Sequence, residues 1–290
     1  MAIAARSTTP IEIIALDSMT LYRGFDIGTA KPTAAERAAV PHHMVDVLGP
    51  HDAFSVANYV AAAIQICEQI VDRGHVPLFV GGAGLYLRTM LRGFFDGPQS
   101  NPAIRERLEA EQKRVGNDAF HRQLAVVDPA TAARFHPNDA RRIVRAMEVY
   151  ELTGRTLSEW QDEQPRPEPA RAVWIDPPRD WIHDRINTRV DQMLAEGWLD
   201  EVRMLLATDP PPDSIFWTML GYPQLAEVVS GDRDLADATK RVKELTRQFA
   251  KRQYTWFRNL TEVQAIPLDP SQSTGVLAEQ FAAALDIPLR

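Results

Sequence analysis

Two short apolar segments, each followed at once by small or polar residues, constrain the fold of this chain most strongly. Residues 11–16 (IEIIAL) and 76–82 (VPLFVGG) are rich in apolar and branched side chains, as expected of strands buried on both faces. A helix is predicted between them over about 56–73, because Ser55 supplies an N-cap and Gly74 a stop. This order of strand, helix and strand predicts a parallel sheet with both faces covered.

Asp17 and the glycine turn of residues 81–84 each stand directly after a predicted strand. Ligands of open parallel sheets bind at the carboxyl ends of the strands, so we expect Asp17 and the turn to face one crevice. The turn would let the backbone approach an anion at the start of the next helix, from about Leu85. Neither feature is specific alone, because a purely structural turn, or an Asp17 that only caps its own turn through Ser18, would look the same.

The composition is that of an ordinary globular protein, with 45% hydrophobic and 24% charged residues, enough for one large domain or two smaller ones. The one cysteine, Cys67, excludes an internal disulfide and fits a reducing, cytoplasmic location. No apolar run approaches the roughly 18 residues of a membrane span, so no membrane partner is expected. Nothing indicates an obligate oligomer, so a monomer is expected.

The adjacent His42 and His43 lack metal-ligand spacing. They are expected to support neighbouring site residues or to pack within the fold.

The middle of the chain has a different pattern. From residue 98 to about 170 it shows short amphipathic helical segments and no convincing strand. The stretch 164–171 (QPRPEPAR) predicts a stiff exit linker, and 172–176 (AVWID) returns to strand. We therefore expect an α/β core made of residues 1–97 and 171–290, with a helical insertion domain over 98–170. A long helix over about 181–206 and a last strand over 261–268 complete the expected core.

The segment 240–258 (KRVKELTRQFAKRQYTWFR) predicts an amphipathic helix with a basic face. At about 100° per residue, the cations share one stripe and the apolar side chains the opposite one. The basic stripe comprises Lys240, Arg247, Lys251 and Arg258, and the apolar stripe Val242, Leu245, Phe249 and Trp256. We expect the apolar stripe to pack down and the basic stripe to face outward. The net charge of −7 excludes a general polyanion binder, so a nucleic acid would meet this local surface through its phosphates. A merely solvated charged face is the alternative interpretation.

Several stretches taken together resemble, in order, the tRNA dimethylallyltransferases. They are DSMTLYRGFDIGTAKP, VPHHMVDVLGPHDAFSVANY, PLFVGGAGLYLRTML, HPNDARRIVRAMEVYELTGRTLS and RQFAKRQYTWFR, and they span residues 11 to 260. The family adds an isopentenyl-type group to N6 of the adenosine just 3′ of certain anticodons. The resemblance implies an enzyme with a P-loop-NTPase-like parallel sheet core and a helical insertion domain. It also implies a tRNA anticodon stem-loop and dimethylallyl diphosphate as substrates, and Mg²⁺ as cofactor.

The resemblance further implies the site residues. Asp17 matches the carboxylate that accepts a hydrogen bond from the adenine amine and takes its proton. The adenine must be flipped from the anticodon loop and held in line with the allylic carbon. The implied diphosphate-binding residues are Gly81, Gly82, Gly84 and Lys31. The implied tRNA-binding residues are Asp17, Ser18, Met19, Thr20, Ala83, Arg105, Arg141, Arg142, Ile143, Val144, Arg145, Thr218, Gly221, Tyr222, Arg247, Lys251, Arg252, Gln253, Trp256 and Arg258.

The chain departs from the family pattern at its start. The family has a strand and a phosphate-binding loop of the form G-x-x-x-x-G-K-[ST], which holds the diphosphate and a Mg²⁺ ligand, and no such pattern occurs here. Two interpretations compete: the natural protein is longer than this chain, or this is a variant without the loop. As written, the chain is expected to show weak or no catalysis, and strands beside the absent one are expected to expose apolar edges. Ala83 also stands where the family usually has Thr, which removes a hydroxyl near the reacting centre.

Three alternative functions stay open. A non-catalytic protein that only binds the anticodon loop would tolerate the absence of the phosphate loop, but it would not require the Asp17 motif. An adenylate isopentenyltransferase, which acts on a free nucleotide, generally lacks a large helical insertion. A nucleoside or nucleotide kinase shares only the fold and has little support without a phosphate loop.

Overall fold

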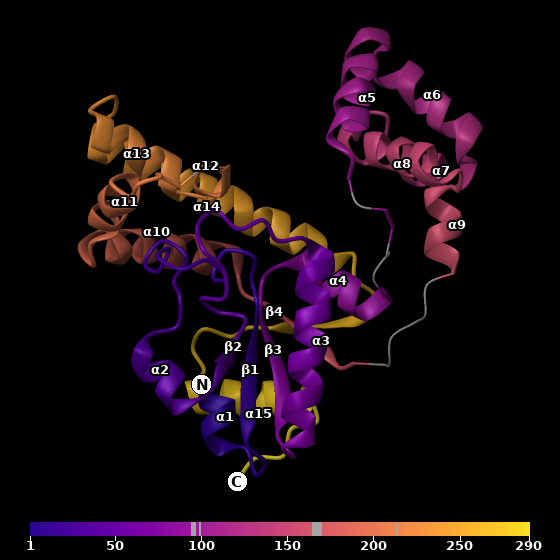
Figure 1. The fold of residues 1–290 in the computed structure, drawn as a ribbon. Helices are drawn as coiled ribbons and strands as arrows, with labels where there is room; N and C mark the ends of the chain where they lie inside the picture. The colour runs from indigo at the N-terminus through magenta and orange to yellow at the C-terminus, as the bar shows by residue number, and fades with distance from the viewer. Residues whose placement is uncertain (94–96, 99, 164–169, 213) are drawn as a thin grey trace. The chain divides into compact units, whose positions relative to one another are not determined.

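The computed structural model describes residues 1–93, 97–98, 100–163, 170–212 and 214–290. The chain divides into two compact units (Figure 1). The core unit comprises Met1–Arg88 and Pro169–Arg290, and the helical unit comprises Thr89–Glu168. No helix among the described residues is long and apolar enough to cross a membrane.

A three-stranded parallel sheet in the order β2-β1-β3 lies at the centre of the core unit. The strands are β1 (Ile11–Leu16), β2 (His42–His43) and β3 (Val76–Gly81). Every residue of β1 is buried, as its apolar sequence predicts. Its pairing with β3 runs from Ile11 opposite Val76 to Leu16 opposite Gly81. The predicted parallel sheet is therefore confirmed, whereas the two-residue strand β2 was not predicted.

A second parallel pair is formed by β4 (Ala172–Asp176) and β5 (Val263–Pro267). Both strands were predicted from their sequence. Among the described strands, nothing pairs with the second edge of β3, and β4 pairs with β5 alone. Val80 on β3 and Ile175 on β4 are 49% and 47% exposed, so the expected exposure of apolar side chains on edge strands is observed.

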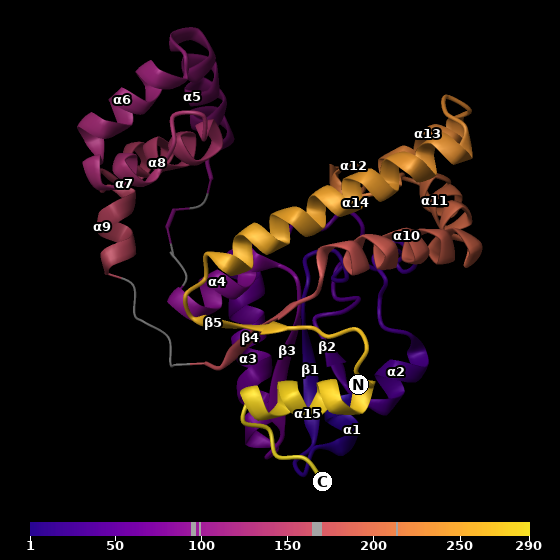
Figure 2. The ribbon, with the colours of Figure 1, turned by 180° about the vertical axis from the view of Figure 1, so that it is seen from behind.

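The core unit carries most of the helices. α3 covers one face of the three-stranded sheet, and α1 with α15 cover the other (Figures 1 and 2). α10 and α14 run side by side above the carboxyl ends of the strands (Figure 2). The helices are α1 (Ala2–Arg6), α2 (Ala34–Ala39), α3 (Val56–Asp72), α4 (Gly84–Arg92), α10 (Arg179–Ala195), α11 (Trp198–Leu206), α12 (Ser214–Thr218), α13 (Tyr222–Ser230), α14 (Leu235–Arg258) and α15 (Thr274–Ala284).

The predicted long helix over 181–206 is wrong in one respect, because it is two helices, α10 and α11. The break falls at Gly197, whose φ of 101° is left-handed, a conformation that glycine adopts without steric cost. The predicted helix over 56–73 is confirmed as α3. Its N-terminus is a capping box in which Ser55 and Asn58 bond to each other's backbone.

The helical unit consists of α5 (Pro102–Val115), α6 (Asn117–Val127), α7 (Pro129–Arg134), α8 (Ala140–Thr153) and α9 (Leu157–Asp162). Its own apolar core includes Leu108, Phe120, Leu124 and Val149. The amphipathic segments of the sequence over 101–116, 118–128 and 138–154 correspond to α5, α6 and α8, whereas the short helices α7 and α9 were not predicted. The predicted exit linker over 164–171 lies largely outside the described residues.

A buried ion cluster stabilises the amino end of the sheet. Glu12 on β1 is 4% exposed. Its Oε1 accepts two hydrogen bonds from the Arg73 guanidinium, at 3.0 and 3.1 Å. Ring nitrogens of His43 and His75 lie 2.6 and 2.7 Å from the same carboxylate. These contacts, the Arg73 hydrogen bond first, lower the pKa of Glu12 from 4.5 to about 2. His43 on β2 thus has a structural partner, the Glu12 carboxylate on β1.

The Glu12 cluster predicts how stability depends on pH. Because the folded-state pKa of Glu12 lies below its ordinary value, the ionised Glu12 carboxylate stabilises the folded state above about pH 5. This stabilisation is lost as the pH falls toward 2. Glu12→Gln should lower the free energy of unfolding at neutral pH by about 2–3 kcal/mol and weaken its acid dependence in this window. Urea denaturation between pH 3 and 7 measures both effects.

Glu279→Gln is the matched control, since Glu279 forms an exposed ion pair with Arg6 and should change stability by at most about 1 kcal/mol. Equal effects of the two substitutions, or an unchanged acid dependence in Glu12→Gln, would contradict this account of the cluster.

Candidate active site and RNA-binding surface

Asp17 follows the last residue of β1, at the carboxyl end of the sheet. Its Oδ1 accepts hydrogen bonds from the backbone N–H groups of Met19 and Thr20, at 2.7 and 3.4 Å. Asp17 therefore caps its own turn, which was the structural interpretation of this residue. The same bonds fix the orientation of the carboxylate at the end of the strand. The side chain is only partly buried, so the cap and a chemical role are compatible.

The glycine turn lies directly against the end of β1. Ala83 N–H donates to the carbonyl of Leu16 at 3.0 Å. A Cβ on Gly81 would lie only 2.2 Å from the same oxygen, so the close approach of these two backbones requires glycine. The structure thus brings Asp17 and residues 81–84 to one place, as their positions after adjacent parallel strands predict.

Two stacked tyrosines lie near Asp17. The rings of Tyr59 and Tyr86 are 4.1 Å apart, and the Tyr59 hydroxyl donates to the carbonyl of Ala15 at 2.8 Å. Burial, with the nearby charge of Asp17 as a smaller cause, raises the pKa of Tyr59 and raises that of Tyr86 to about 12. Both hydroxyls are therefore protonated at neutral pH.

Arg189 on α10 is a functional candidate that the sequence analysis missed. Desolvation lowers the pKa of its guanidinium, and the Asp17 carboxylate opposes this shift, so the two charges influence each other. An arginine remains cationic under all ordinary conditions. The available signal was the pair Arg185 and Arg189, one turn apart on the helix that follows β4. Only the tertiary structure shows that a cation on this helix lies within electrostatic range of Asp17.

α14 also reaches the glycine turn. Gln253 donates its side-chain N–H to the carbonyl of Gly82 at 3.1 Å. The Trp256 side chain lies against Gly84, where an added Cβ would be 3.1 Å from it. The Arg88 guanidinium lies 5.3 Å above the Trp256 ring. Two of the residues implied to contact tRNA, Gln253 and Trp256, are therefore neighbours of the turn beside Asp17.

Lys31 has a different role from the one that the family resemblance implied. Its side chain is 3% exposed, and its ammonium contacts carboxylate oxygens of Asp26 and Asp46 at 2.5 and 2.6 Å. It also donates to the carbonyl of Tyr22 at 2.8 Å. All three donors of the ammonium are used by groups of this chain, which ties the loop after β1 to the segment after β2. These contacts do not support the diphosphate-binding role that the resemblance implied for Lys31.

Tyr222 is likewise a packing residue. It is fully buried, and its hydroxyl donates to Glu201 at 2.7 Å. The other bonds of the Glu201 carboxylate come from the backbone N–H groups of residues 26, 27 and 28, at 2.9, 2.7 and 3.3 Å. The burial of the Tyr222 side chain leaves it no exposed surface for an RNA contact.

Two neighbouring residues of the implied tRNA-binding set differ in their surroundings. Gly221 lies against the Trp198 ring, whereas Thr218 is exposed.

Two of the five implied contact residues on α8 have buried side chains. Ile143 and Val144 are 1% and 3% exposed because they belong to the core of the helical unit. Arg141 and Arg142 on the same helix are exposed. Arg145, and Arg105 on α5, each lie 2.9 Å from the fully buried carboxylate of Glu148. The motif RRIVR thus alternates between surface and core, as an amphipathic helix requires.

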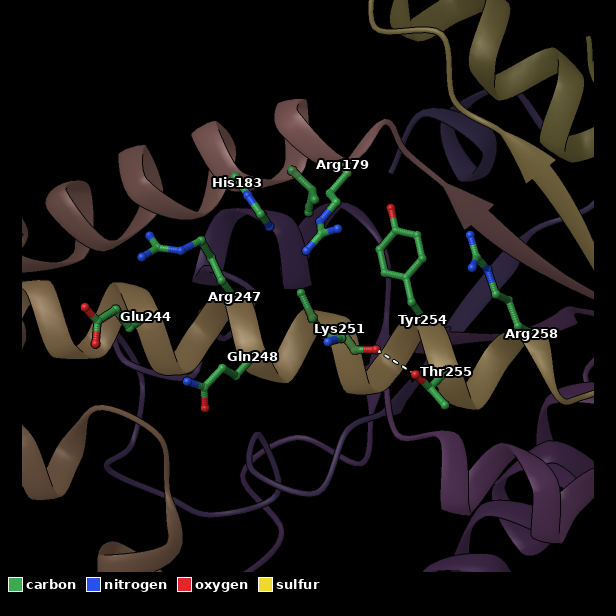
Figure 3. A pocket seen from close by; sticks show the side chains of 11 residues that line it. Arg179, His183, Glu244, Arg247, Gln248, Lys251, Tyr254, Thr255 and Arg258 are labelled. Atoms are coloured by element: carbon green, nitrogen blue, oxygen red, sulfur yellow. Dashed lines mark hydrogen bonds between the residues drawn. The ribbon is translucent and has the colours of Figure 1, made fainter.

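Three residues of the basic stripe of α14, Arg247, Lys251 and Arg258, line a groove with α10 (Figure 3). The groove encloses a cavity of about 480 Å³. Arg247 donates to Asn187 on α10 at 2.7 Å, and the Tyr254 hydroxyl donates to the carbonyl of Pro177. We call this surface the basic groove; its lining includes Arg179, His183, Glu244, Arg247, Lys251, Tyr254 and Arg258. Such a concentration of cations suits phosphate groups.

The apolar stripe of α14 differs from its prediction. Val242 is 1% exposed and packs into the core as expected, but Phe249 and Trp256 are 44% and 38% exposed. Helical periodicity places these residues on one face but does not show how far the neighbouring elements extend along it.

A metal site built by protein ligands alone does not fit the structure. Among the described residues, no group of three or more His, Cys, Asp or Glu side chains could hold a metal ion. A Mg²⁺ ion that is held mainly by substrate phosphates and water would not need such a group.

Comparisons with known proteins identify the family. The IPP transferase family model matches residues 20–260. The tRNA dimethylallyltransferase of Syntrophobacter fumaroxidans is 44% identical over 85% of this chain and 73% of its own length. That of Roseiflexus sp. is 43% identical over 94% of this chain and 91% of its own.

Solved structures agree with this family. The tRNA isopentenylpyrophosphate transferase of Bacillus halodurans is 36% identical and superimposes with a TM-score of 0.68 over 98% of this chain and 90% of its own. A eukaryotic dimethylallyltransferase acting on tRNA is 25% identical and gives a TM-score of 0.77 over 96% of this chain and 74% of its own.

Fold and site together thus define an α/β protein of the P-loop-NTPase-like class with a parallel sheet core. The chain belongs to the IPP transferase family.

The contact between the glycine turn and β1 predicts unequal effects of two neighbouring substitutions. Gly81→Ala should lower stability by about 1–3 kcal/mol, because its Cβ would meet the backbone oxygen of Leu16 at 2.2 Å. Gly82→Ala should cost less, because its Cβ would meet only the movable end of the Gln253 side chain. Chemical denaturation of both variants measures the difference. Similar midpoints for the two variants would contradict this close approach.

Proposed function

We propose that this chain transfers a dimethylallyl group from dimethylallyl diphosphate to N6 of the adenosine just 3′ of the anticodon in tRNA. The observation that carries the proposal is the oriented Asp17 carboxylate at the end of β1, beside the glycine turn and α14. Membership of the IPP transferase family supports it, as does the eukaryotic relative acting on tRNA. These relatives favour the enzyme over a protein that only binds the anticodon loop.

The reaction forms a bond between the adenine nitrogen and the allylic carbon, and it breaks the bond between that carbon and the diphosphate oxygen. An exocyclic adenine amine is a poor nucleophile. Asp17 accepts a hydrogen bond from this amine and takes its proton as the new bond forms. The backbone bonds to Met19 and Thr20 hold the carboxylate in place for this transfer. The adenine must leave its stack to reach Asp17, and its alignment supplies much of the rate.

The leaving diphosphate requires positive charge and backbone donors. We assign it to the glycine turn, residues 81–84, and to Arg189, in place of the buried Lys31. Mg²⁺ would arrive with the diphosphate, bound mostly through phosphate oxygens, and would neutralise part of its charge. Ala83 offers no hydroxyl here, so its contribution is limited to its backbone, which bonds to Leu16.

The basic groove provides the cations for the RNA backbone. Lys251 and Arg258 are exposed there, on the helix whose other side touches the glycine turn. We propose that the groove binds phosphates and that the helical unit, through exposed Arg141 and Arg142, provides a second tRNA contact. A monomer is expected to suffice, because every group used here belongs to one chain.

Asp17→Asn tests the base directly. The amide keeps the size of the side chain but cannot take the proton, so kcat should fall by about 10²- to 10⁴-fold. The Kd for a stem-loop RNA should stay within about twofold, since the loop fold is retained. Transfer is measured as labelled dimethylallyl incorporated into RNA, and binding by fluorescence anisotropy. Asp72→Asn, an exposed carboxylate at the end of α3, is the matched control and should leave both values unchanged.

Each outcome of this experiment decides between functions. RNA binding without transfer by the unmodified chain would favour the binding-only alternative. Transfer to free AMP in preference to RNA would favour the adenylate enzyme. Equal transfer by Asp17→Asn and the unmodified chain would exclude Asp17 as the base.

Lys251→Gln tests the basic groove. Each lost phosphate contact should reduce the slope of log Kd against log salt concentration by about 0.7–0.9. Affinity should fall by similar factors for RNA stem-loops of different sequence, because phosphate contacts carry no sequence information. Lys113→Gln, an exposed lysine on α5, provides a charge-matched control. An unchanged slope for Lys251→Gln would remove Lys251 from the RNA contact.

A further inference from the structure

The turn that carries Asp17 is held from outside by a residue that the proposed chemistry does not use. Within the turn, Met19 N–H donates to the Asp17 carboxylate at 2.7 Å, but the bond from Thr20 N–H is long, at 3.4 Å. The carbonyl of Thr20 accepts a further bond, from the backbone N–H of Asp46 at 3.1 Å. Thr20 is therefore bonded to Asp17 through its N–H and to Asp46 through its carbonyl.

The segment after β2, residues 44–48, pairs with the same loop at further points. Leu48 N–H donates to the carbonyl of Leu21, and Arg23 N–H donates to the carbonyl of Leu48, both at 2.9 Å. The Arg23 guanidinium also donates to the carbonyl of Asp46 at 2.9 Å. Because these bonds join the two segments along their length, a displacement of Asp46 would displace the loop that holds Asp17.

Asp46 makes these bonds from an uncommon backbone conformation. Its φ is 57°, and Met44, which is 2% exposed, has a φ of 59°. Left-handed residues other than glycine are uncommon and cost free energy, although aspartate tolerates the conformation better than most residues. Two such residues among three successive positions must be imposed by the surrounding contacts. Backbone strain of this kind is concentrated at functional sites.

Lys31 and Arg37 hold the side chain of Asp46. The Lys31 ammonium lies 2.6 Å from its Oδ1, and the Arg37 guanidinium lies 2.6 Å from its Oδ2. Burial opposes the charge of the carboxylate, but the bonds from these two cations outweigh it and lower the pKa of Asp46. Lys31, whose side chain is 3% exposed, also donates to the carbonyl of Tyr22 at 2.8 Å. The ion pair of Asp46 and Lys31 thus contacts the loop after Asp17 at both Thr20 and Tyr22.

We propose that Asp46 and Lys31 are positioning residues that fix the Asp17 carboxylate for dimethylallyl transfer. This inference rests on the proposed function, because it takes Asp17 as the base. Asp46 acts through Thr20, and Lys31 acts through Asp46; neither contacts the substrate. A displacement of about 1 Å at a reacting group can lower a rate by about 100-fold, so a base on a loop needs such support. A contribution to fold stability alone is the competing explanation, and it predicts no dependence on Asp17.

The test is a double-mutant cycle in which Asp46→Asn is made in the unmodified chain and in Asp17→Asn. Asparagine keeps the size of the side chain and tolerates the left-handed conformation, but it removes the charge that binds Lys31 and Arg37. In the unmodified chain, kcat should fall by about 10- to 100-fold, with the Kd for a stem-loop RNA within about twofold. In Asp17→Asn, the same substitution should change kcat by less than about twofold, because the base through which it acts is already absent. Lys31→Met should reproduce both results.

Hydrogen exchange followed by NMR provides a readout that does not require transfer. The amides of Met19 and Thr20 should exchange about tenfold faster in Asp46→Asn than in the unmodified chain. Glu12→Gln is the control for stability, because it breaks the ion cluster at the amino end of β1. It should lower the unfolding midpoint but leave kcat and these two amides within about twofold of the unmodified chain.

The outcomes separate this inference from the proposed function. If the unmodified chain transfers the group and Asp46→Asn transfers it equally well, the positioning role is overturned and the proposed function stands. Equal losses of kcat with and without the Asp17 carboxylate would show a role in the fold alone and would also overturn it, as would unchanged exchange at Met19 and Thr20. If the unmodified chain does not transfer the group, the proposed function fails, and the positioning role fails with it.

Discussion

The parallel pairing of β1 with β3 is the constraint on which the rest of the site depends. The register of this pairing places Leu16 opposite Gly81, so the segments that follow β1 and β3 both leave the sheet at the same edge. The glycine turn can then bond back to the end of β1, and Asp17 stands next to it. Only a residue without a side chain fits at position 81, because the Leu16 carbonyl occupies that space. α14 contacts the same turn through Gln253, so the helix that carries the basic stripe lies beside this turn.

Buried carboxylates elsewhere are fully committed to structure, which sets Asp17 apart. Glu12 binds Arg73 at the amino end of the sheet, and Glu201 binds three backbone N–H groups and Tyr222 beside the loop after β1. In the helical unit, Glu148 binds Arg105 and Arg145. Each of these groups would be costly to bury without such partners. Asp17 is only partly buried and caps a turn through one oxygen, which is compatible with the role proposed for it above.

The sequence predicted what depends on local pattern and missed what depends on tertiary contacts. The strands β1 and β3 were predictable because both are short, apolar and followed by turn residues. Motif resemblance names segments but not the direction of each side chain: Lys31, Tyr222, Ile143 and Val144 lie within the segments it implies, and their side chains are buried. The electrostatic influence of Asp17 on Arg189 depends on how α10 packs, and the sequence shows only that Arg185 and Arg189 are one helical turn apart. Helical periodicity found the apolar stripe of α14, but the exposure of Phe249 depends on what covers it.

The most direct test of the account is backbone hydrogen exchange with and without a stem-loop RNA, because it shows where on the chain the RNA binds. The account predicts slower exchange in residues 17–24, 81–88 and 247–258 when RNA is added, with no change around Glu12, His43 and His75 at the opposite end of the strands. Slowed exchange confined to that opposite end, with the Asp17 loop and α14 unaffected, would contradict the account.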